Sequence, residues 1–225
     1  MAWISGNRAL TQAESDNNGN IVASFFLAQG WSKESVAAIT GSMYAESYIN
    51  PGLWEEGMPE WGRYSGYGLV QWTPASELVE VCEYAHLGDY TDGTVQLQAI
   101  MVEYTTTVSD LIQWIPTYQW PISFQQWATN SVGYSVDDLT QAFIDNYLRP
   151  ADPHQPRYQA AAQRWYTIIT TGDYPDTPTP TPTPGPGPQP PGPQPGLPID
   201  FTQPWSVLFL KGSNGRRQRV FYGRR

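Results

Sequence analysis

The amino-acid sequence predicts an α+β fold that is mainly helical over residues 1–176. Three observations lead to this prediction. Apolar residues recur at spacings of three and four along several segments, which is typical of helices that bury one face. Strand patterns with regular alternation are sparse in the same region. One stretch rich in glycine and proline, residues 50–72, interrupts the helical pattern and predicts a long loop with a short β excursion.

The helices are predicted from their end signals as well as from periodicity. The first runs over Asn20–Gln29 and ends at Gly30, because glycine readily adopts the left-handed backbone of a helix end. Ser32 caps the second helix, with Glu34 near its positive end. The later predicted helices are Ala75–Ala85, Val95–Tyr104, Ser123–Thr129, Val136–Leu148 and Gln155–Thr170.

A carboxylate interrupts the apolar face of the second helix. Val36, Ile39 and Met43 recur at helical spacing, and Glu46 falls on the same face at about 100° per residue. A partly buried carboxyl favours its protonated form, and an acid kept protonated near neutral pH is a candidate general acid. Gly41, within this helix, costs about 1 kcal/mol against alanine, which indicates close packing by another helix.

Composition changes sharply after residue 176. Residues 177–198 form a proline-rich segment without charges, which predicts an extended, disordered linker. Residues 199–225 form a basic tail of net charge +5, whereas residues 1–176 carry −14. Apolar stretches at 205–210 and 218–222 within the tail predict a hairpin. We therefore expect one domain over 1–176, the linker and the basic tail.

Several classes of function are disfavoured by composition. The single cysteine excludes an internal disulfide, and two histidines are too few for an ordinary zinc site, so no metal or cofactor is expected. An acidic body is a poor candidate for binding nucleic acid. Residues 1–7 lack a basic segment followed by an apolar one, so no secretory signal is expected, and no apolar run reaches the length of a membrane span.

Two motifs and a later segment carry a resemblance to a known family. The motifs read GWSKESVAAITGSMYAESYINPGLWEEG over residues 30–57 and YGLVQWTP over residues 67–74. Residues 143–166, FIDNYLRPADPHQPRYQAAAQRWY, are similar to the closing helices of the same family. Together these segments resemble the phage tail lysozyme family and, more loosely, goose-type lysozymes and soluble lytic transglycosylases. The resemblance spans about residues 15–170 and implies a lysozyme-like domain.

The resemblance implies roles for particular residues. Glu46 is the expected general acid, paired with Ser47 at the end of its helix. In the loop motif, Gly68 is expected to let backbone approach the substrate, and Gln71 to orient sugar groups or Glu46, or equally to bond loop backbone. The further candidate substrate-binding residues are Tyr67 and Trp72, which suit sugar stacking or core packing equally, and Tyr147, expected as a hydrogen-bond partner of Glu46.

Glycoside hydrolysis also needs a group opposite the acid, and the acidic loop supplies candidates for it. Glu60, between Pro59 and Trp61, is the preferred second carboxylate, with Glu55 and Glu56 as alternatives. The resulting prediction is a lysozyme that hydrolyses the β-1,4 bond between N-acetylmuramic acid and N-acetylglucosamine. The alternatives are a lytic transglycosylase acting on the same bond and a non-catalytic peptidoglycan-binding module.

A wall peptidase using Cys82 and His154 is a further alternative. Cys82 shares one helical face with Leu78, Val81 and Ala85, which favours a core position for its thiol.

The expected partner is bacterial cell-wall peptidoglycan. The basic tail is expected to meet anionic wall polymers or a phage tail protein. Delivery without a secretory signal suggests either a part of the phage virion, at the tail, or a lysin that reaches the host cell wall after release.

Overall fold

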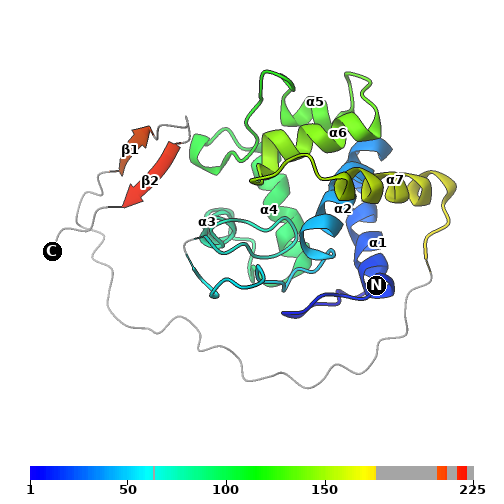
Figure 1. Ribbon diagram of the computed structural model, residues 1–225, viewed down its shortest axis with the longest axis horizontal. Coiled ribbons are helices and arrows are strands. Elements are labelled where there is room, and N and C mark those ends of the chain that lie inside the picture. The colour runs from blue at the N-terminus through cyan, green and yellow to red at the C-terminus, as the bar shows by residue number, and fades with distance from the viewer. Residues whose placement is uncertain (63, 176–206, 212–216, 222–225) are drawn as a thin grey trace. The chain divides into compact units, whose positions relative to one another are not determined.

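The computed structural model describes residues 1–62 and 64–175, together with the backbone of two strands, Val207–Lys211 (β1) and Arg217–Phe221 (β2). The chain divides into two compact units, residues 1–181 and 182–225. The described part of the first unit is mainly helical (Figure 1). Its α-helices are α1 (Gln12–Ala28), α2 (Lys33–Ser47), α3 (Ser76–Tyr84), α4 (Gly93–Thr105), α5 (Phe124–Thr129), α6 (Val136–Phe143) and α7 (Pro156–Thr171). A short 3-10 helix, Ser109–Leu111 (η1), precedes α5, and a π-helix, Ile144–Leu148 (η2), continues α6.

The described residues of the first unit form no strand, so the β content predicted for the lysozyme-like domain is not supported. In the loop that follows α2, isolated bridges join Trp54 to Tyr67 and Tyr67 to Trp72. In the second unit, β1 and β2 pair antiparallel, with Val207 opposite Phe221. The predicted linker, residues 177–198, lies outside the described residues.

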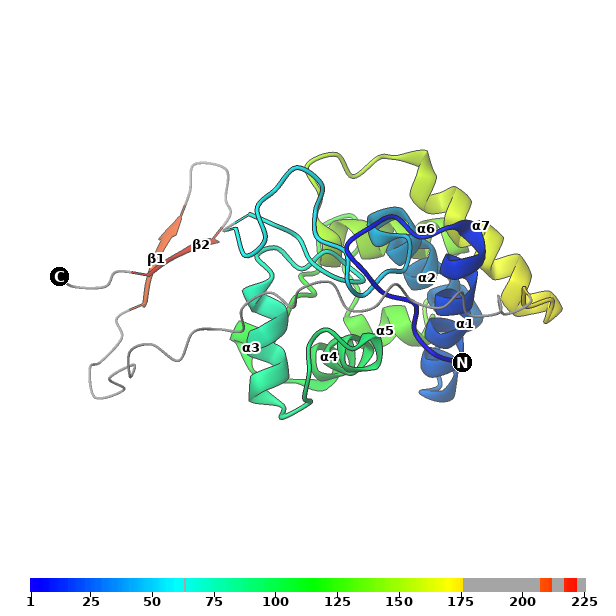
Figure 2. The same ribbon diagram turned by 90° about the horizontal axis from the view of Figure 1, so that it is seen from below.

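Helix α2 occupies the centre of the first unit. It packs against α1, α5, α6 and α7, and every residue from Ser35 to Met43 is buried. Residues 35–43 are apolar or small on every side of the helix, which is why this part of α2 can be enclosed by others. Both views place it among these helices, with the segment after α2 reaching toward α3 (Figures 1 and 2).

The close helix packing expected at Gly41 is confirmed. A Cβ atom at this position would lie 2.3 Å from the backbone nitrogen of Ala162 in α7. Real Cβ atoms do not approach backbone this closely, so only glycine lets the two helices touch here. The contact sets how α7 lies across α2, and α7 carries residues of the candidate site.

The first helix begins at Gln12, eight residues before the predicted start at Asn20. The missed part is polar yet buried, with Ser15, Asp16, Asn17 and Asn18 enclosed by neighbouring chain. Apolar periodicity is absent there, so a hydrophobic pattern does not reveal it. A capping box, in which Thr11 and Glu14 bond each other's backbone N–H groups, marks the true start.

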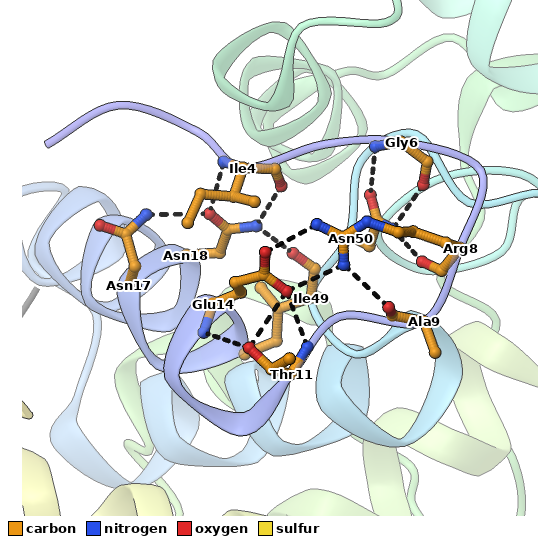
Figure 3. Close-up of polar contacts among 10 residues, drawn as sticks. All are labelled: Ile4, Gly6, Arg8, Ala9, Thr11, Glu14, Asn17, Asn18, Ile49 and Asn50. Atoms are coloured by element: carbon orange, nitrogen blue, oxygen red, sulfur yellow. Dashed lines mark hydrogen bonds and ion pairs between the residues drawn. The ribbon is translucent and has the colours of Figure 1, made fainter. Parts of the chain in front are cut away.

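Buried asparagines fasten the N-terminal segment to the core (Figure 3). The Asn18 side chain accepts from the backbone of Ile4 at 2.9 Å and donates to the Ile4 and Ile49 carbonyls at 2.7 and 2.8 Å. Asn50 donates to the carbonyls of Gly6 and Arg8, both at 2.7 Å. The N-terminal segment is thereby bound to the turn that directly follows α2.

None of the helices in the described residues is both long and apolar enough to cross a membrane.

Candidate active site

Glu46 lies in the last turn of α2, partly buried, and its Oε1 accepts a hydrogen bond from the hydroxyl of Tyr158 in α7. Burial raises the pKa of Glu46 above its usual value. The Tyr158 hydrogen bond and the positive charge of Arg157 oppose this effect, whereas the negative charge of Glu55 adds to it. A desolvated carboxyl with a fixed hydrogen-bond donor is the arrangement expected of a general acid.

Tyr158 keeps its proton in this environment. Burial and the charge of Glu46 raise the pKa of the Tyr158 hydroxyl to about 12. The phenol is therefore a hydrogen-bond donor at neutral pH and fixes one oxygen of the carboxyl group.

The backbone after Glu46 turns through an uncommon conformation. Tyr48 and Ile49 both have φ of 57°, in the left-handed region, which is costly for the β-branched isoleucine. The Ile49 amide donates to the Met43 carbonyl, and the Ile49 carbonyl accepts from Asn18. These bonds, with those of Asn50 seen in Figure 3, hold the end of α2 in place.

Ser47 connects the end of α2 to the loop motif. Its hydroxyl donates to the carbonyls of Met43, at 3.1 Å, and Leu69, at 3.0 Å, and the side chain is fully buried. Gly68 has φ of 77°, and a Cβ there would lie 2.5 Å from the side-chain oxygen of Gln96. Gln96 in turn accepts from the Leu69 amide at 2.9 Å. Ser47 and Gly68 therefore fasten the loop beside Glu46 in this structure.

The other predicted loop residues are also occupied by the protein itself. The Gln71 side chain donates to the carbonyls of Leu53 and Gly68, at 3.1 and 3.0 Å. Tyr67 and Trp72 each expose only 4% of their surface. A ring that stacks on a sugar needs one open face, so the core alternative describes these two residues better.

The phenol that bonds Glu46 is Tyr158, not the predicted Tyr147. The Tyr147 hydroxyl, in η2, donates to Oε2 of Glu103, and Trp72 donates to Oε1 of the same carboxyl at 3.2 Å. Glu103 is buried, and this desolvation raises its pKa to about 8, although the two hydrogen bonds lower it. The sequence pattern did not single out this second enclosed carboxyl, which fastens α4 to the loop and to η2.

The acidic loop residues occupy different surroundings. Glu55 accepts from the Gly66 amide at 3.0 Å through Oε2, and its charge acts on Glu46. Glu60 accepts from Asn7 at 3.2 Å, and its charge acts on Tyr67 and Tyr90. Both carboxylates are exposed.

Cys82 is buried in α3, and desolvation raises the pKa of its thiol to about 11. A nucleophilic cysteine needs a lowered thiol pKa, so this environment does not favour a peptidase. No group of three or more histidine, cysteine or acidic side chains able to hold a metal occurs in the part of the chain that the structure describes.

The chain has relatives among phage proteins. The sequence model of a family described as phage tail lysozyme matches residues 17–169. The chain is also similar to Morphogenesis protein 1 of Bacillus phage B103, with 32% identity over 169 residues. That alignment covers 75% of this chain and 43% of the relative, so the chain spans less than half the length of the relative.

Proposed function

Because the chain belongs to the phage tail lysozyme family, we propose that it hydrolyses the β-1,4 bond between N-acetylmuramic acid and N-acetylglucosamine in peptidoglycan. The observation that carries this proposal is the environment of Glu46. Its carboxyl is desolvated at a helix end and bonded by the buried Tyr158. The acid role of Glu46 and the identity of the bond are both part of the proposal.

In the proposed reaction, Glu46 protonates the glycosidic oxygen as the bond to the muramyl C1 breaks. Tyr158 donates to Oε1, which leaves Oε2 as the oxygen that carries the proton. The hydrogen bond fixes the direction of the carboxyl group, so that proton transfer needs no reorientation.

Glu55 is a better candidate than Glu60 for the carboxylate opposite Glu46. Its charge reaches Glu46, and the Gly66 amide holds its Oε2. The two carboxyl groups have contrasting surroundings, since Glu46 is desolvated and Glu55 is exposed. Such a contrast separates the acid from the base in hydrolases that use two carboxyl groups. Glu55 would accept a proton from the water that attacks C1.

The test is digestion of purified peptidoglycan, with mass spectrometry of the fragments. Glu46→Gln keeps the side-chain volume but has no proton to give, so a loss of at least about 10²-fold is expected. Glu55→Gln should also lower turnover strongly, with Glu56→Gln and Glu60→Gln as matched controls. Reducing ends indicate hydrolysis, whereas 1,6-anhydro ends would assign the reaction to a lytic transglycosylase. A folded Glu46→Gln variant with full activity would remove Glu46 from the mechanism.

We further propose that the enzyme acts as part of a phage virion. The relative from phage B103 is named a morphogenesis protein, which supports a virion role over a released lysis enzyme. The basic residues 199–225 would then contact wall polymers or a tail protein, separated from the catalytic unit by residues 177–198.

A further inference from the structure

Of the arginines that the structure describes, Arg157 is the one whose charge acts on the proposed acid. Arg157, in the first turn of α7, is exposed, and its guanidinium carbon lies 5.2 Å from the centre of the Tyr158 ring. Tyr158 is the residue that bonds Glu46, and the charge of Arg157 acts on Glu46 directly. Arg157 therefore places a positive charge at the edge of the candidate site.

The acid role of Glu46 does not explain this cation. A neighbouring positive charge favours the ionised carboxylate and so lowers the pKa of a group that must stay protonated. Two other cations are engaged in ion pairs, Arg8 with Glu14 at 2.6 Å and Arg164 with Asp16 at 2.7 Å. Arg157 takes part in neither ion pair of the described residues. Its guanidinium is hydrogen-bonded to the Tyr158 hydroxyl, and its remaining N–H groups are available to an anion from outside.

The proposed substrate carries such anions near the scissile bond. In peptidoglycan a peptide branches from C3 of the muramyl ring, and the bond to be cleaved leaves C1 of the same ring. The peptide bears free carboxylates. A guanidinium binds a carboxylate through two parallel hydrogen bonds, which makes arginine well suited to recognise one.

Resting on the proposed function, we propose that Arg157 binds a carboxylate of this branching peptide and makes the enzyme selective for peptide-bearing glycan. The catalytic unit as a whole opposes such a ligand, because residues 1–176, with Arg157 included, carry a net charge of −14. The positive charge of Arg157 beside the acid would therefore attract the peptide carboxylate and also favour glycan that carries the peptide.

The same contact would couple substrate binding to the acid. Among the described residues, the groups whose charges or hydrogen bonds act on Glu46 are Tyr158, Arg157 and Glu55. A bound carboxylate offsets the charge of Arg157, which removes its pull toward ionised Glu46. Glu46 is then better protonated in the complex with peptide-bearing substrate than in the free enzyme.

The experiment compares two substrates with the full chain: soluble glycan strands with their peptides, and the same strands after amidase removal of the peptides. The wild type should prefer the peptide-bearing strands by about tenfold or more in kcat/KM, the size of one charged hydrogen-bonded contact. Arg157→Gln should bring this ratio close to one, and Arg157→Lys should retain part of it. Lys33→Gln is the matched control for charge, since Lys33 lies at the other end of α2, roughly 20 Å away along the helix.

A pH profile gives a second readout. The alkaline limb of the kcat profile should lie at a higher pH for peptide-bearing strands than for stripped strands. Arg157→Gln should remove this difference in pH. Equal losses on both substrates in Arg157→Gln, or a wild type without preference, would overturn the proposal. Full activity of Glu46→Gln would instead overturn the proposed function, so the two failures are distinguishable.

Discussion

Replacing Gly41 by alanine tests whether the contact between α2 and α7 limits both stability and activity. The added Cβ would lie 2.3 Å from the Ala162 nitrogen and 2.5 Å from its Cα, both backbone atoms that cannot rotate away. Overpacking of this kind costs about 1–3 kcal/mol, and a rigid backbone contact belongs at the upper end. Alanine returns about 1 kcal/mol through its helix propensity. The net loss should be about 2 kcal/mol.

Thermal unfolding followed by circular dichroism measures this loss. In a domain of this size, each kcal/mol lowers Tm by about 2–4 °C, so Gly41→Ala should unfold about 4–8 °C below the wild type. Activity should also fall at temperatures where the variant is folded, because a displaced α7 carries Tyr158 away from Glu46. Ala160→Gly is the control, because Ala160 is exposed on α7 and its exchange for glycine changes Tm through helix propensity alone. A Tm equal to or above that of the wild type would refute the reasoning.

Three further predictions concern the site and the tail. Tyr158→Phe removes a hydrogen bond that favours ionised Glu46, so the pKa of Glu46 should rise. Because activity is lost as pH rises through that pKa, the alkaline limb of the kcat/KM profile should move to higher pH. A limb that stays in place or moves down would contradict this. Thiol-blocking reagents should leave the folded enzyme active, because Cys82 is buried with a raised thiol pKa, and inactivation without unfolding would revive the peptidase alternative. Truncation after Asp176 should leave hydrolysis of soluble fragments unchanged and weaken retention of the protein on whole walls at low salt. Equal retention of the truncated and the full chain would contradict a wall-binding tail.

The sequence led to Glu46 because the signal is local. A carboxylate at helical spacing from Val36, Ile39 and Met43 is visible within a dozen residues, and the structure places it partly buried, which raises its pKa. The close packing at Gly41 could be predicted in the same way, because a glycine inside a helix is costly unless another element packs closely against it.

The partners of Glu46 depend on contacts between distant parts of the chain. Tyr158 lies 112 residues further along, and another tyrosine, Tyr147, stands in the same closing segment. A pattern of residue types does not distinguish them, because the direction of each phenol depends on how α7 packs on α2 and how η2 continues α6. Glu60 as the second carboxylate stays a prediction, and the contact of Glu55 with the Gly66 amide depends on a turn that the residue pattern does not specify.

The buried position of α2 has a consequence for how this protein can diverge. In many enzymes the reactive group sits on a peripheral loop, and the core can drift while the chemistry is preserved. Here the proposed acid belongs to the helix that the other helices enclose, so exchanges of core side chains shift the acid as well. The reverse does not hold, because Glu46 is only partly buried and can be replaced without opening the core. Descendants should therefore lose catalysis more readily than architecture, and inactive relatives with an intact helical unit are an expected product of divergence.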